Sequence, residues 1–582
     1  MKEEMIMKYT FKYMAIALLS LSGAVSCSDF LDRPSEDTYT EATFYLSDEQ
    51  CEQGVNYLYN SPWFDVIRGY YRTGEGLSGN YYMGGSPYMN FSVNGSDSEL
   101  TDMSKSLWAV NSNCSTVYNR LKTAACSEET RARLMGEVLT WKAFAYFFLV
   151  RSFGDVPIIH DAQAEIAGGK YNQIYKVQKA DVYEYIVMTL EKALELLSDT
   201  KITSGFERYG RIDYYAAEAL LAKVYLTKAG VSGTLSDADL AKAAEYAKDV
   251  IDNSGRSLME EYSDIFRGSN NRNKEALISW HWDASAQPWT TQNAFQSDLA
   301  MKGFDEFGDC WGEWNGPSVD LQEAFGVTAL QDPSNRPDPD KRRAATMMLA
   351  GDKYSYFWRD KGGFDYLKFL YDETYGAGGP GNLCCNTGAA CVKFLYGNTA
   401  DHVAELGVSP ARQAYGVSTH ILRLADVYLI YAEAKIGASR GSTTDKTALD
   451  AFYAVRHRAR SNYDYPASIS WDDVWKERRL ELALEGDRWY DFVRLAYYAP
   501  DEAINEIRSQ KRNYYDNIEG VYKNYFESGV WDASEASYNT SDAAPAVTAS
   551  SFTLPFPSED VVFNPNLSAA PIHVDVRSEY SY

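Results

Sequence analysis

The sequence predicts a mainly α-helical protein in which paired helices form a scaffold and one long loop-rich stretch is inserted between them. Two observations support this fold class. Apolar residues recur at the helical period in segments on both sides of the middle of the 582-residue chain. Between residues 281 and 417 that period fails, and Gly, Pro, Asn and aromatic residues take over. Because a loop-rich stretch of this size inside a compact protein is usually functional, we expect it to carry the ligand site.

The first predicted helices lie in the N-terminal half. Ser47 and Gln50 form a capping box at the start of one of them. The segment Leu139–Val150 is apolar on nearly all sides, and Gly154 and Pro157 follow it, which predicts a buried helix that ends there. Further helical segments span 181–197, 213–230, 236–252, 421–437, 447–460 and 471–495.

These helices come in pairs joined by short Gly-containing turns, with Ala and Tyr alternating on the packed faces. Helix hairpins of the tetratricopeptide type stack in this way, because small residues on one helix admit large residues from its neighbour. The spacing is irregular, so the predicted repeat is degenerate and split. We divide the mature chain into an N-terminal helical region (41–280), a loop-rich ligand-binding region (281–417) and a C-terminal helical region with a tail (418–582).

The N-terminus has the pattern of a lipoprotein signal. Lys8 and Lys12 precede an apolar run, 13–25, that is shorter than the roughly 20 residues needed to cross a bilayer. Ala24–Cys27 then fits the small-residue motif at which bacterial lipoproteins are cut and acylated. We expect residues 1–26 to be removed as a signal peptide. The alternative is an ordinary secretory peptide with an incidental cysteine.

Lipidation of Cys27 predicts where the protein is located. Two or three acyl chains on this residue would give stable membrane anchoring, with residues 27–40 as the lipidated tether. The acidic stretch "SDFLD" directly after Cys27 resembles the export signal that sends lipoproteins to the outer face of some Gram-negative cells. The expected location is therefore the outer membrane, lipid-anchored and facing the exterior.

Composition limits the partners and cofactors. The formal net charge is −25, and an acidic surface repels nucleic acid, so neutral molecules or other proteins are the expected partners. The cysteines that remain beside Cys27 are odd in number and cannot all pair. The group Cys384, Cys385 and Cys391 has no nearby His to complete a zinc site. We expect no metal and no cofactor, and whether one disulfide forms stays open.

Candidate ligand-binding residues are the aromatic and polar side chains of the Gly-rich loops. A sugar ring presents its C–H face to flat aromatic side chains and its hydroxyls to polar groups. An exposed aromatic residue in such a loop is costly unless a ligand or a partner protein covers it. The predicted ligand-binding residues are Tyr71, Arg72, Asn80, Tyr81, Tyr82, Trp282, Trp289, Asn293, Trp311, Trp314 and Asn315. Trp108 is a further candidate, although packing against Tyr118 at a helix entry explains it equally well.

No catalytic residue is predicted. Glu477, Glu481 and Glu485 lie at the spacing of one helical face, but Arg478, Arg479 and Arg488 are adjacent, which favours a salt-bridged helix over a catalytic acid pair. Zinc-protease motifs and Walker motifs do not occur in the sequence. We therefore predict that the protein is not an enzyme.

Several motifs resemble the SusD/RagB family of starch-utilisation-system outer-membrane nutrient-binding lipoproteins. The lipidation motif followed by "CSDFLD" is similar to the family's start, and "GEVLTWKAFAYFFLVRSFGDVPII" to its buried helix and turn. "EYSDIFRGSNNRNKEALISW", "DPDKRR", "LRLADVYLIYAEA", "ERRLELALEGDRWYDFVRL" and "LPFPSEDVVFNPNL" follow in family order. The resemblance spans nearly the whole mature chain, and the two late helical motifs are its most specific parts.

The resemblance implies a fold with four tetratricopeptide-like hairpins and a variable loop-rich half that carries the ligand site. It also implies a partner, a SusC-like TonB-dependent transporter in the outer membrane, over which the lipoprotein sits as a lid. Such proteins capture oligosaccharides and pass them on without cleaving them. Two alternatives remain: a peptide-binding import lid on the same scaffold, since some relatives take peptides, and a surface glycosidase.

Overall fold

The computed structural model describes residues 44–201, 210–285, 287–376, 379–541 and 545–582. The predicted signal peptide, the lipidated Cys27 and the tether at 27–40 lie outside the described residues. Within the described part of the chain, no helix is both long and apolar enough to cross a membrane.

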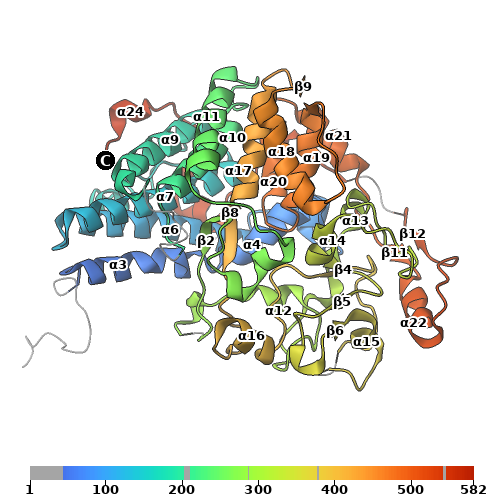
Figure 1. The fold of residues 1–582 in the computed structure, drawn as a ribbon. Helices are drawn as coiled ribbons and strands as arrows, with labels where there is room; N and C mark the ends of the chain where they lie inside the picture. Colours follow the sequence, from blue (N-terminus) through green and yellow to red (C-terminus); the bar gives the residue numbers. More distant parts are fainter. Residues whose placement is uncertain (1–43, 202–209, 286, 377–378, 542–544) are drawn as a thin grey trace, which may run out of the picture.

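A stack of helices forms the scaffold (Figure 1). Its helices are α3 (Asp48–Asn56), α4 (Val66–Tyr71), α6 (Ser98–Thr123), α7 (Glu128–Phe153), α9 (Lys179–Leu196), α10 (Tyr214–Lys228), α11 (Asp237–Asn253), α17 (Leu424–Ile436), α18 (Lys446–Ala459), α19 (Trp471–Glu481), α20 (Arg488–Ala496) and α21 (Pro500–Ser509). Each helix of the series α6, α7, α9, α10, α11, α17 and α18 packs against the next one. Since α11 and α17 pack directly, the N-terminal and C-terminal helical regions form one continuous stack. The mainly helical fold predicted from the sequence is confirmed.

Helix α7 shows why these residues form this element. The Ser127 hydroxyl accepts a hydrogen bond from the Thr130 amide at the N-terminus, and Gly154 ends the helix with a φ of 70°, which glycine adopts without strain. All residues from Leu139 to Val150 are buried, as the sequence predicts. This helix is surrounded by α6, α9 and α3, so an all-round apolar surface is stable there.

The loop-rich region leaves and rejoins the scaffold at one point. Strand β2 (Ala276–Trp280) pairs antiparallel with β8 (Thr419–Arg423), and Trp280 lies opposite Thr419. Between them come only short elements, which lie below the helical stack in Figure 1. They include α12 (Phe295–Leu299), α13 (Val319–Ala324), α14 (Lys341–Thr346), α15 (Tyr366–Tyr371), α16 (Thr399–Leu406), β3 (Gly316–Pro317), β4 (Met347–Met348), β5 (Lys353–Tyr354), β6 (Phe364–Asp365) and β7 (Ala390–Cys391).

This region has an aromatic core of its own. Phe304, Trp358, Phe364 and Phe369 are buried and contact one another, with ring centroids 5.0–6.2 Å apart. Many of the aromatic residues that the sequence places in this stretch therefore stabilise the region itself. An N-terminal segment joins it, because β1 (Tyr81–Tyr82) pairs with β3. Near the C-terminus, β11 (Tyr515–Asp516) pairs with β12 (Ser537–Tyr538), and α22 (Ile518–Ser528) packs on α15.

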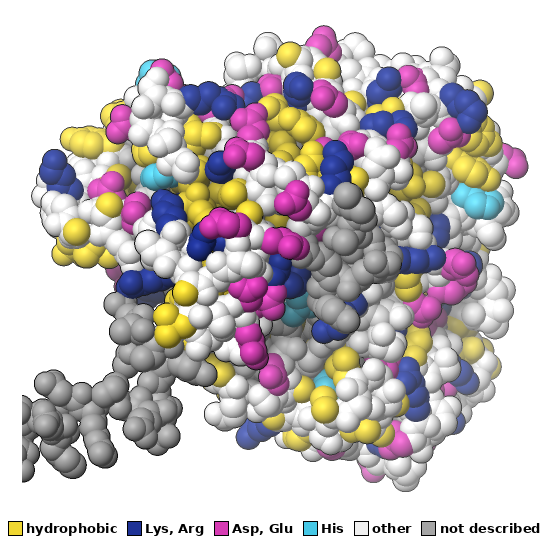
Figure 2. Space-filling view, turned by 60° about the vertical axis from the view of Figure 1, so that its left-hand side comes forward, with side chains coloured by type: hydrophobic (Ala, Val, Ile, Leu, Met, Phe, Trp, Pro, Cys, Tyr) yellow, Lys and Arg dark blue, Asp and Glu magenta, His cyan; other side chains and the backbone are white. Residues whose placement is uncertain are grey.

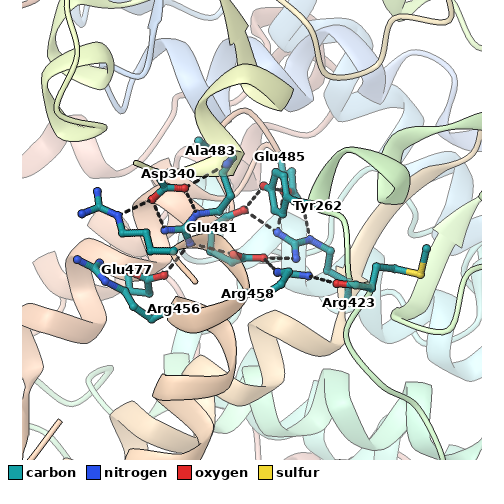
Figure 3. A network of polar contacts seen from close by, with 12 residues as sticks. Tyr262, Asp340, Arg423, Arg456, Arg458, Glu477, Glu481, Ala483 and Glu485 are labelled. Carbon is teal, nitrogen blue, oxygen red and sulfur yellow. Dashed lines mark hydrogen bonds and ion pairs between the residues drawn. The ribbon is translucent and has the colours of Figure 1, made fainter. Parts of the chain in front are cut away.

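A buried ion network connects the two parts of the molecule (Figure 3). Arg342 of α14 binds Glu477 at 2.6 Å and Glu481 at 2.9 Å, both on α19. Arg423 of β8 binds Glu481 and, through two hydrogen bonds at 2.8 and 2.9 Å, Glu485. All these charged groups are buried, so each depends on its partners to offset the loss of hydration.

The predicted partners of these glutamates are wrong. Glu477 and Glu481 of α19 pair with arginines of α14, β8 and α18, and α19 ends before Glu485. Arg478 pairs with Asp426 and Asp491, Arg479 with Asp320, and Arg488 with Glu506. The glutamates are ion-paired as predicted, but with residues distant in the sequence that no local spacing reveals.

The seven cysteines after Cys27 all lie in the described residues, and all are free thiols. Cys51 and Cys114 belong to the helical scaffold, whereas Cys310, Cys385 and Cys391 are buried in the loop-rich region. No disulfide joins any two of the seven in this structure.

Candidate functional site

A cleft of about 200 Å³ lies where the scaffold meets the loop-rich region. Three aromatic side chains, Phe64, Trp289 and Trp311, line it. Trp289 is 51% exposed and Trp311 is 42% exposed, so both indole rings offer accessible apolar surface. We call this site the aromatic cleft.

Local structure fixes the orientation of Trp311. Its indole Nε1 donates a 2.8 Å hydrogen bond to Oδ1 of Asp298, a buried residue of α12. Its backbone amide donates to the Ser297 carbonyl oxygen at 2.9 Å. With both ends held, the ring stays partly exposed without free rotation, which lowers the entropy lost when a ligand binds.

Trp311 follows α12 in the sequence, whereas Trp289 precedes it. It opens a short 3-10 turn, Trp289–Thr291, that follows Pro288. Its ring meets Phe64 edge to face, with centroids 6.4 Å apart. Phe64 precedes α4, so this pair brings the N-terminal scaffold and the loop-rich region together at the cleft.

The polar lining of the aromatic cleft is predominantly acidic. Four carboxylates and one guanidinium contribute, and they belong to Asp65, Arg68, Glu99, Asp102 and Asp298. Arg68 Nε donates to Asp298 Oδ2 at 3.3 Å, so the one cation is already paired. Burial raises the pKa of Asp65, and the nearby charge of Asp102 raises it further. Burial also raises the pKa of Glu99, against the opposing effect of Arg72. Such a lining accepts hydrogen bonds from hydroxyl groups and repels anions.

Of the predicted ligand-binding residues, Trp289 and Trp311 come together in the aromatic cleft. Trp314 is 64% exposed but does not line it. Asn315 is half-buried and directly follows the short helical turn Gly312–Trp314. Arg72 pairs with Glu99 and so supports the cleft wall from behind.

Several other predicted residues have structural roles instead. Trp282 is buried and donates to the Thr419 hydroxyl at 3.0 Å, and the Asn293 amide donates to the Val417 carbonyl oxygen at 2.9 Å. Asn80 is fully buried between Glu75 and Arg479. Tyr71 and Tyr81 are buried and pack edge to face, whereas Trp108 is half-buried and packs edge to face on Tyr146. Buried side chains already paired within the protein are not available to a ligand from solvent.

Tyr82 lies elsewhere, in a wider cleft of about 640 Å³. Its other aromatic residues are Tyr514 and Tyr538, and its cations are Arg508, Lys511 and Arg512. The Tyr82 and Tyr514 rings meet edge to face at 6.1 Å. This cleft is larger, but of the two only the aromatic cleft combines two exposed tryptophans with hydrogen-bond acceptors among the described residues, so we take the aromatic cleft as the candidate site.

Sequence reasoning missed Phe64, Arg68, Asp298 and Gln413, which also line the aromatic cleft. Phe64 precedes α4 and Arg68 lies in it, both far from Trp311 in the sequence, and only the fold places them beside it. Asp298 lies in α12, which is too short to show a period. No local signal in the sequence marks these residues as ligand contacts.

The comparisons with known proteins agree with this architecture. A profile described as "SusD family" matches residues 312–573, and one described as "Starch-binding associating with outer membrane" matches residues 96–226. A "SusD-like protein" of Bacteroides ovatus is 31% identical over 585 residues, covering 96% of this chain and 98% of the relative. "SusD-like protein P2" of Formosa agariphila is 28% identical, over 61% of this chain and 63% of its own.

Solved structures share the fold. One, a crystal structure with a xylogluco-oligosaccharide, has a TM-score of 0.75 and 28% identity, covering 91% of this chain and 99% of that chain. Another, a SusD-like carbohydrate-binding protein of Bacteroides fragilis, has a TM-score of 0.65 over 90% of this chain and 100% of that chain. At 18% identity, this second likeness shows the fold alone. The family matches, the relative from Bacteroides ovatus and the common fold together show that the chain belongs to the SusD family.

Proposed function

We propose that this protein captures an uncharged oligosaccharide in the aromatic cleft and delivers it to a SusC-like TonB-dependent transporter, without cleaving it. One observation carries the proposal: Trp289 and Trp311 offer exposed indole surfaces beside a row of hydrogen-bond acceptors. Sugars bind such surfaces because their C–H faces are apolar while their hydroxyls donate hydrogen bonds.

The charge of the cleft favours a neutral ligand. Its carboxylates outnumber its single cation, and Arg68 is engaged by Asp298. A sugar that carries carboxylate or sulfate groups would meet repulsion in this cleft. The relative solved with a xylogluco-oligosaccharide makes that neutral oligosaccharide the first ligand to test.

The location and the partner belong to the same proposal. A diacylated Cys27 would hold the protein on the outer membrane, facing the exterior, with the transporter beneath it. The family profile described as associating with the outer membrane supports the membrane assignment. The acidic composition of the chain supports a partner other than nucleic acid.

Isothermal titration calorimetry tests the ligand assignment. Xylogluco-oligosaccharides and a panel of other neutral glycans are titrated separately into three proteins: the purified mature wild-type chain, the Trp289→Ala variant and the Trp311→Ala variant. Loss of one stacking surface should weaken binding by about 1 to 3 kcal/mol, roughly 5- to 150-fold in Kd. Tyr465→Ala is the matched control, because Tyr465 is 46% exposed but lies beside α18 in the scaffold.

Two results would contradict the proposal. If both tryptophan variants bind as the wild type does, the site lies elsewhere. If no glycan binds while a peptide mixture does, the protein is a peptide-binding lid. Release of new reducing ends during long incubation with a bound glycan would show a glycosidase instead.

A further inference from the structure

Three side chains that can ligate a metal meet in the loop that precedes Trp311. Asp305, Asp309 and Cys310 each offer one ligand atom, and these atoms all lie within 4.8 Å of one another. All three residues are 3–4% exposed. The Cys310 thiol already lies 3.3 Å from Asp305 Oδ2. We call this group the 305–310 cluster.

The cluster contains a buried polar atom without a partner. Oδ1 of Asp309 has no hydrogen-bond partner among the residues that the structure describes. Its Oδ2 accepts only a long hydrogen bond, 3.4 Å, from Arg412, whose side chain is largely exposed. Leaving a buried carboxylate oxygen without a hydrogen bond is unfavourable, because its lost hydration is not replaced. A bound cation would remove that cost.

Two buried carboxylates so close to each other are unfavourable without a counter-charge. Asp305 and Asp309 are 4% and 3% exposed, and their ligand atoms lie within 4.8 Å of each other. Asp305 does receive hydrogen bonds, from Gln296 Nε2 at 3.3 Å and from the Phe307 amide at 3.0 Å. These donors are neutral, so the largely exposed Arg412, 3.4 Å from Asp309, is the cation that the described residues bring to the pair.

The ligand types select among metals. Zinc takes four ligands in tetrahedral geometry, with a Zn–S bond of about 2.3 Å and a Zn–O bond of about 2.1 Å. A sulfur and an oxygen bound to the same zinc ion are therefore about 3.6 Å apart. The Cys310–Asp305 separation of 3.3 Å is close to that value, and since all the ligand atoms lie within 4.8 Å of one another, no pair needs to approach by more than about 1.4 Å. Calcium, with six to eight oxygen ligands, would find too few here.

We propose that the 305–310 cluster binds one zinc ion through the Cys310 thiolate and the carboxylates of Asp305 and Asp309. The Cys310 thiol loses its proton to solvent when the Zn–S bond forms. The sequence predicts no such site, because that expectation rested on His and Cys spacing, whereas this cluster depends on two carboxylates.

The cluster is connected to the aromatic cleft on two sides. Trp311 directly follows Cys310, and Gln413 directly follows Arg412, the residue that binds Asp309. Trp311 and Gln413 both line the aromatic cleft. Zinc would therefore order the loop that presents Trp311 and so strengthen glycan binding. The effect on glycan binding rests on the proposed function, whereas zinc binding itself does not.

Cobalt substitution gives a direct test of zinc binding. The purified mature chain is stripped with a chelator, dialysed, and loaded with Zn²⁺ or Co²⁺. We expect one metal ion per chain by mass spectrometry and a sulfur-to-cobalt charge-transfer band. Cys310→Ser should abolish the band and Asp309→Asn should lower the affinity for zinc at least tenfold. Cys114→Ser is the control, since Cys114 is buried in α6.

Each outcome decides a separate point. A charge-transfer band that persists in Cys310→Ser, or no metal retained by the folded wild type, overturns the site. If zinc binds but the glycan Kd is the same with and without it, the link to the cleft is wrong. If zinc binds and no glycan binds in either state, the proposed function fails while the zinc site remains. Circular dichroism confirms that each variant is folded.

Discussion

Replacing Arg342 with Met tests whether the buried ion network holds the loop-rich region on the scaffold. Arg342 is fully buried and binds Asp340, Glu477 and Glu481. Met fills a similar volume but removes the charge and leaves these carboxylates with fewer counter-charges. Removing one partner from a buried ion pair typically costs about 3 to 5 kcal/mol. We expect the free energy of unfolding to fall by that amount.

Denaturant titration followed by tryptophan fluorescence measures the change. In a thermal scan, a loss of about 3 to 5 kcal/mol in a chain of this size corresponds to a Tm lower by roughly 2.5 to 4 °C. Arg577→Met is the matched control, because Arg577 and Glu191 form a pair whose side chains are 56% and 38% exposed. Exposed pairs contribute at most about 1 kcal/mol. If Arg342→Met is no more destabilising than Arg577→Met, the network does not carry the stability assigned to it.

Three further predictions concern pH, the C-terminus and the lipid anchor. Burial lowers the pKa of His281 and of His420 to about 4, whereas an unfolded histidine has a pKa of about 6.5. The unfolded state therefore binds more protons between these values, and the free energy of unfolding should fall by roughly 3 kcal/mol per histidine as the pH drops from about 6.5 to about 4. A Tm that stays constant between pH 6.5 and pH 4 would contradict this. Tyr582 packs edge to face on Tyr118, and its hydroxyl lies 3.0 Å from that of Tyr185. Deleting residues 580–582 should therefore lower the free energy of unfolding, measured in urea, by about 1 to 3 kcal/mol. An unchanged urea midpoint would refute a stabilising role of the C-terminus. Cys27→Ser should abolish incorporation of labelled palmitate and leave the folded domain's circular dichroism unchanged; continued labelling would disprove lipidation at Cys27.

Patterns of local periodicity predicted the scaffold well. The all-apolar segment Leu139–Val150 is indeed a buried helix, because a helix contacted on several sides needs no polar face. The sequence predicted that the glutamates of α19 form ion pairs, but not which arginines they pair with. Glu481 pairs with Arg342, Arg423 and Arg458, residues that belong to three other elements and become neighbours only through the fold.

Aromatic residues in loops were harder to assign. Trp282 and Trp311 both lie in Asn-containing segments of the loop-rich region, yet one is buried against Thr419 and the other lines the aromatic cleft. Composition cannot separate these cases, since burial depends on which distant segment covers each ring. The opposite wall of the cleft, formed by Phe64 and Arg68, depends on the same long-range packing.

The pairing of β2 with β8 allows the loop-rich region to be exchanged during evolution, and the binding preference with it. Because the loop-rich region begins and ends at neighbouring strands, its replacement by a segment of different length leaves the ends of the scaffold helices in place. An exchanged segment must still supply the equivalent of Arg342, or the buried acids of α19 are left without their counter-charge. Chimeras that graft the 281–417 segment of a relative onto this scaffold should therefore transfer its ligand preference only when that anchoring arginine is retained.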